Sequence, residues 1–460
     1  MTRPRTLDRP AYDAAVADLR AQLAALPADA PVRLGKTTSN LFRTRADAPQ
    51  GRLDVSAFAG VLEVDPVART ADVLGMTTYE QLVDATLPHG LMPLVVPQLK
   101  TITLGGAVVG LGIESSSFRN GTPHESVLEM DVLTGAGELL RVTPDGPHAD
   151  LFRGLPNSYG TLGYALRLRI ELEPVSPYVH LRHVACGSVD EAAALMSTVS
   201  TDREHAGEPV DFVDAVWFAP TDVRVSLGSW ATTAPRTSDY TGQSVYYRSL
   251  QRRTEDWLTV RDYLWRWDTD WFWCSRAFGA QRPAVRRLWP RRWLRSDVYW
   301  RIVAFERRHR WKTRWDLRRG LPPREDVVQD VEVPVERLAD FMATFAREVP
   351  VEPVWFCPLQ QRRPGPPWPL YPLTPGRLYV NVGFWSSVAL EPGEAPDHHD
   401  RIVERLVGEL GGHKSLYSTS SYGREEFDRL YGGQAYAALK AAYDPSGRLL
   451  DLYDKCVRNR

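Results

Sequence analysis

The stretch Thr103-Leu-Gly-Gly-Ala-Val-Val-Gly-Leu-Gly-Ile-Glu-Ser-Ser-Ser117 decides the fold of this chain. Four glycines and three consecutive serines surround an otherwise apolar run with one carboxylate, Glu114. Glycine lets a backbone approach a bulky partner closely and adopts positive φ without a steric penalty. Successive backbone amides then form a concavity that holds phosphate, with hydroxyl groups as further donors. The composition predicts a buried dinucleotide pyrophosphate site, although a tightly packed glycine turn in a protein core has the same composition.

The bulk composition is that of an ordinary soluble globular protein. At 460 residues the chain is long for one core, so we expect two or three packed lobes. The four cysteines lie far apart without metal-binding spacing, which fits a reducing cytosol. We find no signal-peptide pattern, and the longest uncharged apolar run, 102–113, is too short to span a bilayer. These features predict a cytoplasmic protein and leave attachment to a membrane surface open.

The first 177 residues alternate strand and helix patterns, which predicts an α+β block with its glycines at turns. After a short strand at 32–35 comes the polar cluster Lys36–Asn40, which offers a cation and several donors. This cluster is a candidate second phosphate-facing loop, and a solvated turn has the same composition. The other elements we expect are a helix at 11–26, strands at 61–65 and 70–74, a helix at 79–87 capped by Thr77 or Thr78, a hairpin at 128–142, a short helix from 150 and a strand at 164–172.

The second part of the chain has a different character and predicts a second lobe. Strand patterns at 179–185, 209–218 and 378–385 are interrupted by helical spacing near 189–196. Helices are expected at 400–410 and at about 424–443.

Within this second part, residues 281–320 carry a net formal charge of +11, although the whole chain sums to −1. The segment also contains five tryptophans, and five more lie just upstream between 257 and 273. Arginine interleaved with tryptophan suits an anionic membrane surface, because the cation meets phosphate while the indole sits at headgroup depth. The same residues could instead pack a core, with arginines stacked on aromatic rings or paired with acids. Nucleic acid is not expected, because no zinc-finger, RNP or helix-turn-helix pattern accompanies the charge.

Several motifs taken in order resemble the FAD-binding domain of the vanillyl-alcohol-oxidase superfamily, the PCMH-type flavoproteins. These motifs are Val61-Leu-Glu-Val-Asp65, Thr103-Leu-Gly-Gly106, Gly112-Ile-Glu-Ser-Ser-Ser117, Asp150-Leu-Phe152 and Gly160-Thr-Leu-Gly163. Within that superfamily the Glu-Ser-Ser-Ser run is similar to the Δ24-sterol reductase (desmosterol reductase, seladin) branch. So are Trp355-Phe-Cys-Pro358, Leu378-Tyr-Val, Tyr422-Gly-Arg-Glu-Glu-Phe427 and Tyr453-Asp-Lys-Cys456.

The resemblance implies an α+β, two-lobed FAD-binding PCMH-type fold with a cap or substrate domain. The expected boundaries are an FAD-binding domain of two α+β subdomains at 1–177, a cap domain at 178–410 with an Arg/Trp-rich segment at 246–320, and a C-terminal segment at 411–460 that returns to the flavin site.

The resemblance also assigns candidate FAD-binding residues. The diphosphate is expected against Thr103–Gly106 and Glu114–Ser117 with Lys36–Asn40 facing it, and Gly160–Gly163 at the adenosine end. The full set is Lys36, Thr37, Thr38, Ser39, Asn40, Pro97, Thr101, Thr103, Leu104, Gly105, Gly106, Gly110, Gly112, Glu114, Ser115, Ser116, Ser117, Gly160, Thr161 and Gly163.

Two departures from the resemblance matter. The animal and plant members carry an N-terminal membrane anchor, and we expect none here. The loop Lys36–Asn40 lacks the Arg-Gly-Gly-Gly pattern of many oxidases and the His or Cys that tethers flavin in some relatives. FAD is therefore expected to bind non-covalently, with His124 the nearest candidate tether after the glycine stretch.

The activity implied is reduction of a carbon–carbon double bond in a sterol- or isoprenoid-like lipid, with NADPH as electron donor. Such a reaction needs a positioned acid, and the candidates in the C-terminal segment are Tyr417, Tyr422 and Lys414. Each has a structural alternative as a packing residue or part of a solvated turn. One alternative function is an FAD-dependent oxidase or dehydrogenase of an alcohol, sugar acid or lactone. Another is a non-enzymatic membrane or nucleic-acid binding protein. The actual substrate and the oligomeric state do not follow from the sequence.

Overall fold

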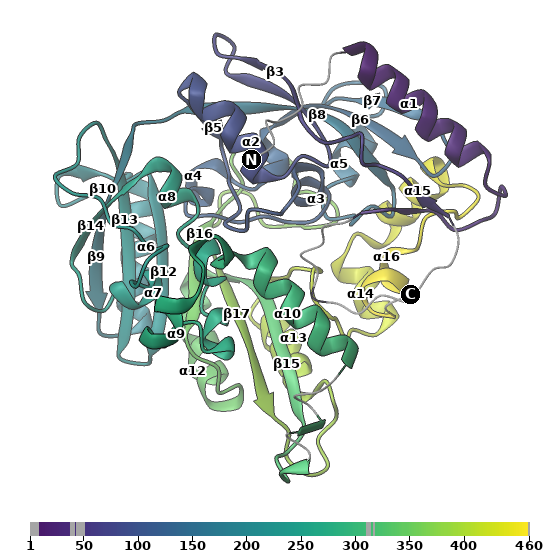
Figure 1. Ribbon diagram of the computed structural model, residues 1–460. Coiled ribbons are helices and arrows are strands. Elements are labelled where there is room, and N and C mark those ends of the chain that lie inside the picture. The colour runs from purple at the N-terminus through teal and green to yellow at the C-terminus, as the bar shows by residue number, and fades with distance from the viewer. Residues whose placement is uncertain (1–8, 37–41, 43–50, 310–313, 316–317, 459–460) are drawn as a thin grey trace.

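The computed structural model describes residues 9–36, 42, 51–309, 314–315 and 318–458 (Figure 1). Its strands form two large antiparallel sheets, and the helices lie around them, in agreement with the predicted α+β fold with two lobes. Among the described residues, no helix has both the length and the apolar character needed to cross a bilayer.

The first sheet has six strands in the order β3-β4-β8-β6-β7, with β5 pairing with β8. The central strand β8 is buried over most of its length, and α3, which begins the glycine stretch, packs against it. Thr78 caps α2 through a capping box with Gln81, which fixes where that helix begins. The bounds of the first-lobe elements are α1 Arg9–Ala24, β1 Arg33–Leu34, β2 Arg52–Leu53, β3 Val61–Asp65, β4 Thr70–Leu74, α2 Tyr79–Thr86, β5 Leu91–Pro93, α3 Leu104–Val109, α4 Ser117–Asn120, β6 Val127–Thr134, β7 Leu139–Val142, α5 Ala149–Gly154 and β8 Gly163–Pro174.

The second sheet has eight strands in the order β14-β9-β13-β12-β16-β17-β15-β18. Its bounds are β9 Tyr178–Cys186, β12 Phe212–Ala219, β13 Asp222–Ala231, β14 Glu255–Thr259, β15 Arg324–Pro334, β16 Val354–Leu359, β17 Tyr379–Ala389 and β18 His413–Lys414. The short pair β10 Glu204–His205 and β11 Glu208–Pro209 lies outside it.

Period-two alternation divides the residues of β15 and β17 between two faces of this sheet. On one face Val331, Val333, Val380 and Val382 join a core with the helices α6 Val189–Asp202, α12 Leu338–Glu348 and α13 His398–Glu409. The opposite face carries Asp330, which is in register with Gly383. The sheet therefore has one apolar face that the helices cover and an opposite, more polar face that is a candidate for a functional site.

The Arg/Trp-rich part of the chain forms short helices between β14 and β15. Their bounds are α7 Tyr246–Ser249, α8 Val260–Leu264, α9 Pro283–Leu288 and α10 Ser296–His309, with 3-10 turns η3 Asp268–Asp270, η4 Cys274–Phe278 and η5 Arg291–Trp293. Trp265, Trp267, Trp271 and Trp273 are buried in the main core. For these four tryptophans, the core-packing alternative is the correct one.

The C-terminal residues return to the first lobe, where α15 packs against α5 (Figure 1, yellow). The prediction of a single helix at 424–443 is wrong, because the chain forms α14 Arg424–Leu430 and α15 Gly433–Tyr443, followed by α16 Leu452–Cys456. The break falls at Gly432 and Gly433, whose φ angles are 87° and 36°. Positive φ is incompatible with continuation of a right-handed helix, so the two glycines divide it.

Candidate active site

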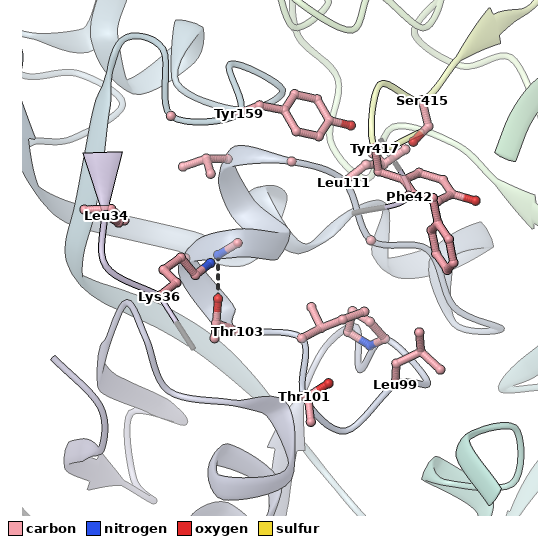
Figure 2. Close-up of a pocket in the computed structure, with 18 of the residues that line it drawn as sticks. Leu34, Lys36, Phe42, Leu99, Thr101, Thr103, Leu111, Tyr159, Ser415 and Tyr417 are labelled. Atoms are coloured by element: carbon pink, nitrogen blue, oxygen red, sulfur yellow. Dashed lines mark hydrogen bonds between the residues drawn. The ribbon is translucent and has the colours of Figure 1, made fainter. Parts of the chain in front are cut away.

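A cavity of about 520 Å³ lies against the glycine stretch and is also lined by residues of the second sheet and the C-terminal segment. Figure 2 shows Lys36 and Thr103 on one side and Phe42, Ser415 and Tyr417 on the other, with Leu111 between them. Volumes of this order are typical of cofactor and ligand pockets. The two ends differ in chemistry, and we call them the polar end and the aromatic end.

The polar end is built around the start of α3. Thr103 caps this helix, and its Oγ1 accepts a hydrogen bond of 3.2 Å from the Gly106 amide. A Cβ added to Gly106 would lie 2.8 Å from Thr103 Oγ1 and 3.8 Å from Lys36 Nζ. Gly106 therefore keeps backbone accessible between a hydroxyl and an ammonium group. Arg33 and Arg52, in register on β1 and β2, also line the cavity, so this end gathers positive charge.

The aromatic end is walled by rings from distant parts of the chain: Phe42, Phe272, Trp355, Trp385 and Tyr417. Phe272 stacks on Trp385 with ring centroids 4.3 Å apart, and Phe42 meets Tyr417 edge-on at 5.7 Å. These rings give this end of the cavity largely apolar walls, which suit contact with a planar ring system.

One carboxyl group, that of Asp330, lines the aromatic end of this cavity. Burial raises the pKa of Asp330 to about 7, and hydrogen bonds from Asn381 and Tyr417 partly offset that rise. The Tyr417 hydroxyl also accepts a hydrogen bond of 3.1 Å from Trp385 Nε1. Burial raises the pKa of Tyr417 well above its usual range. At neutral pH, both protonation states of Asp330 are therefore populated, while Tyr417 stays neutral.

A second carboxyl, Glu332, lies on the same face of β15, two residues beyond Asp330. It is fully buried and is in register with Asn381 on β17 and His413 on β18. Neither carboxyl oxygen of Glu332 has a hydrogen-bond partner among the described residues. Burial, with the nearby charge of Asp330 as a smaller cause, raises the pKa of Glu332 well above its usual range. Burial thus favours the neutral form of Glu332, on the same strand as Asp330.

The Glu-Ser-Ser-Ser run is buried outside the lining of this cavity. Ser115 Oγ donates to Glu114 Oε1 at 2.6 Å, and Arg266 Nη2 donates to the same oxygen at 3.0 Å and to Asp214 at 2.8 Å. The Val213 amide of β12 donates to the Ser115 carbonyl at 2.8 Å. The run therefore joins the first lobe to the second sheet.

The predicted cofactor residues divide into three groups. Those that line the cavity are Lys36, Pro97, Thr101, Thr103, Gly105, Gly106, Gly110, Gly112, Gly160 and Gly163. Those that the structure does not bring to its lining are Leu104, Glu114, Ser115, Ser116, Ser117 and Thr161. Thr37, Thr38, Ser39 and Asn40 lie outside the described residues.

Of the three predicted proton donors, Tyr417 lines the cavity, and Lys414 and Tyr422 do not. Lys414 Nζ is fully buried and pairs with Glu404 at 2.6 Å while donating to the Thr419 carbonyl at 2.6 Å. Tyr422 is also buried, and the Lys414 ammonium lies 6.0 Å from its ring centre. Both residues hold the C-terminal segment together behind the cavity wall.

His124 is also placed away from the cavity lining. Its ring meets Trp368 edge-on at 4.5 Å and forms a hydrogen bond with Thr122. Burial lowers the pKa of His124 to about 3, so the ring is neutral. This position gives no support to His124 as a covalent tether.

Asp330 and Tyr159 were not singled out from the sequence. Asp330 lies in an alternating strand pattern in which a single acid is unremarkable, and its position between Trp355 and Tyr417 depends on the strand order. Tyr159 adopts φ 51°, and Gly110 is its close neighbour, since an added Cβ there would lie 3.3 Å from the Tyr159 ring. The Asn157-Ser-Tyr-Gly160 turn was the signal available for Tyr159.

The cavity's residues fit FAD. Lys36, the hydroxyls of Thr101 and Thr103 and the open backbone at Gly106 supply charge-assisted donors for a diphosphate. The ring-walled end offers a flat apolar space for a tricyclic ring. Because both kinds of lining belong to one cavity, its chemistry suits a dinucleotide with a diphosphate and a flat ring.

Comparisons with known proteins agree with this fit. Residues 16–143 match the FAD binding domain family. The Delta(24)-sterol reductase of Arabidopsis thaliana is 24% identical over 445 residues, covering 89% of this chain and 77% of that protein. The Homo sapiens Delta(24)-sterol reductase is 26% identical over 413 residues, covering 86% and 76%. The decaprenylphosphoryl-beta-D-ribose oxidase of Mycolicibacterium smegmatis is 34% identical over 147 residues, or 32% of each chain.

These matches confirm the resemblance drawn from the motifs. Residues 16–143 are an FAD binding domain, and the chain resembles the Delta(24)-sterol reductases along most of its length.

Proposed function

We propose that this FAD-binding oxidoreductase reduces a carbon–carbon double bond of a sterol- or isoprenoid-like lipid, with NADPH as electron donor. The observation that carries the proposal is the aromatic end of the cavity, where one titratable acid, Asp330, faces an otherwise apolar space. An alkene that lacks polar groups fits such walls. The resemblance to Delta(24)-sterol reductases over most of the chain supports the same chemistry.

Bound FAD supplies hydride transfer through its ring. The chain's own residues hold the alkene, exclude water and provide the proton that completes the reduction at the second carbon. Asp330 is the proposed donor, because its pKa of about 7 keeps a substantial protonated fraction at neutral pH. Tyr417 orients the Asp330 carboxyl through its hydroxyl, which Trp385 holds in place. Burial favours the neutral form of Glu332, two residues further along β15, so it adds no charge beside Asp330.

The division into an FAD domain at 1–177, a cap at 178–410 and a returning segment at 411–460 is part of the proposal. It is supported by the first sheet ending at Pro174, the second beginning at Tyr178, and Ser415 and Tyr417 lining the cavity.

Anaerobic mixing of the purified yellow protein with NADPH tests the function. We expect the flavin colour to bleach and then return when a sterol with a side-chain double bond is added, with formation of the saturated sterol. If NADPH leaves the colour unchanged under these conditions, the reductase proposal fails.

A second candidate is an FAD-dependent oxidase or dehydrogenase of an alcohol, sugar acid or lactone. The match to the M. smegmatis oxidase over a third of the chain favours it. Bleaching by such a substrate without NADPH, followed by recolouring in oxygen, would support this reading. A protein that stays colourless after incubation with FAD would instead support a non-enzymatic binding role.

A further inference from the structure

Large apolar side chains at the protein surface are concentrated in one segment. Of the eight large hydrophobic residues classed as exposed in the described part of the chain, seven lie between 285 and 321. The most exposed are Leu288 at 85%, Trp315 at 61%, Phe305 at 50% and Trp293 at 48%. The remaining residues of the seven are Val285, Ile302 and Leu321. Exposed hydrophobic residues are normally scattered singly over a protein surface, so a concentration of them indicates an interaction site.

The same segment also carries a concentration of arginines, most of them exposed. Two of its arginines turn inward: Arg286 pairs with Asp270 at 2.7 Å, and Arg295 pairs with Glu80 at 2.8 Å. The others that the structure describes as exposed are Arg282, Arg287, Arg291, Arg292, Arg301, Arg314, Arg318 and Arg319. Exposed arginines and exposed apolar residues are therefore interleaved along α9, η5 and α10 and in the described residues that follow, up to 321. We call this part of the chain the α9–α10 segment.

One side of α10 packs against residues at the aromatic end of the cavity. Trp300 meets Phe42 edge-on at 5.5 Å and Trp271 at 6.1 Å, and Phe42 lines the cavity beside Tyr417. Ile302 and Phe305, three residues apart on the same helix, are exposed. Helix α10 thus carries both exposed apolar residues and Trp300, which contacts Phe42 in the cavity wall.

We propose that the α9–α10 segment docks this protein on an anionic lipid bilayer. Arginine binds lipid phosphates, while Trp293, Leu288 and Phe305 enter the headgroup and upper acyl region. A nucleic acid would use the same positive charge but would gain little from Leu288 and Phe305, so the apolar residues favour the membrane. Docking would bring the aromatic end of the cavity close to the bilayer; delivery of a lipid substrate there rests on the proposed function, whereas docking itself does not.

Co-sedimentation of the flavin-loaded protein with vesicles tests the docking. We expect binding to vesicles that contain phosphatidylglycerol, weak binding to pure phosphatidylcholine, and loss of binding as salt rises. The substitutions Leu288→Ser and Phe305→Ser should each weaken binding by about fivefold to tenfold, because an apolar contact with the bilayer is lost. Arg291→Gln with Arg292→Gln should weaken it by roughly tenfold or more.

Matched controls lie elsewhere on the surface. Val67→Ser removes an apolar side chain that is 93% exposed outside the segment. Arg337→Gln removes an arginine whose side chain is 43% exposed, also outside the segment, so neither variant should change vesicle binding. An unchanged flavin spectrum would show that each variant is folded.

Three outcomes would overturn the proposal. They are no binding to anionic vesicles at low salt, equal binding by Leu288→Ser and wild type, or a dimer in solution that Leu288→Ser dissociates. Salt-sensitive binding to duplex DNA that survives Leu288→Ser, without vesicle binding, would favour nucleic acid instead. None of these readouts uses NADPH or a sterol, so failure of docking is separate from failure of the proposed function.

Discussion

The backbone amide of Leu416 donates a hydrogen bond to the hydroxyl of Tyr159 across 3.0 Å, joining residues that are 257 positions apart. Tyr159 is anchored on its own side as well, because its amide donates to the Val109 carbonyl at 2.7 Å. Lys455 Nζ donates to the Tyr159 carbonyl at 2.6 Å. This single residue therefore connects the glycine stretch with two parts of the C-terminal segment, and it does so at the wall of the cavity.

Substitution Tyr159→Phe should destabilise the protein by about 1–3 kcal/mol, since it leaves the Leu416 amide buried without its acceptor. The ring packing against Gly110 is kept, so the variant removes the hydroxyl and leaves the ring contacts in place. Urea unfolding of the FAD-free protein measures the loss, and FAD dissociation should become faster. An unchanged free energy of unfolding would contradict the role of Tyr159 as a tie across the cavity.

The glycines of the stretch serve two different purposes, which paired substitutions separate. A Cβ on Gly105 would lie 2.7 Å from the Gly75 carbonyl oxygen, so Gly105→Ala should lower the free energy of unfolding. A Cβ on Gly106 meets the movable Thr103 hydroxyl at 2.8 Å and projects toward Lys36. Gly106→Ala should therefore fold but retain less FAD, measured by flavin absorbance after gel filtration. Full FAD retention in Gly106→Ala would show that the diphosphate does not lie there.

Local structure was predictable wherever one short pattern determines it. The strands at 61–65 and 70–74 have the predicted bounds, and the helix expected at 79–87 is α2 with Thr78 as its cap. The reason for the glycines was predicted only in part. At Gly105 and Gly112 the close neighbours are protein atoms, the Gly75 carbonyl and the Pro97 and Pro123 rings, which no local pattern reveals.

The aromatic end of the cavity could not be predicted because it is assembled by strand order. Asp330, Trp355 and Trp385 come from β15, β16 and β17, and they meet through a register that spans residues far apart in the chain. The same limit applies to Glu114, whose charge was noticed in the sequence but whose partner, Arg266, is 152 residues away. Motifs identify the cofactor end, whereas the catalytic end depends on tertiary pairing.

Substitutions at Lys414 distinguish a structural role of its side chain from a role in the reaction. Its ammonium is buried against Glu404, so Lys414→Met should leave a buried charge unpaired and cost about 3–5 kcal/mol of stability. The double variant Lys414→Met, Glu404→Leu should recover much of that loss, as measured by urea unfolding. If instead the single variant keeps its stability but loses turnover with FAD bound, Lys414 acts in the reaction.

Asp330 gives the proposed reaction its pH dependence. The proton donor must be protonated, and burial raises the pKa of Asp330 to about 7, so sterol reduction should fall as pH rises through about 7. The folded state keeps a proton that the unfolded state releases at lower pH, so stability should also decrease as pH rises toward 7. Asp330→Asn should lower kcat by about 10²–10⁴-fold and remove this pH limb while FAD stays bound. Tyr417→Phe, which removes the hydroxyl that orients Asp330, should shift the limb and keep more activity. A pH profile of kcat that is the same for Asp330→Asn and wild type would exclude Asp330 as the donor.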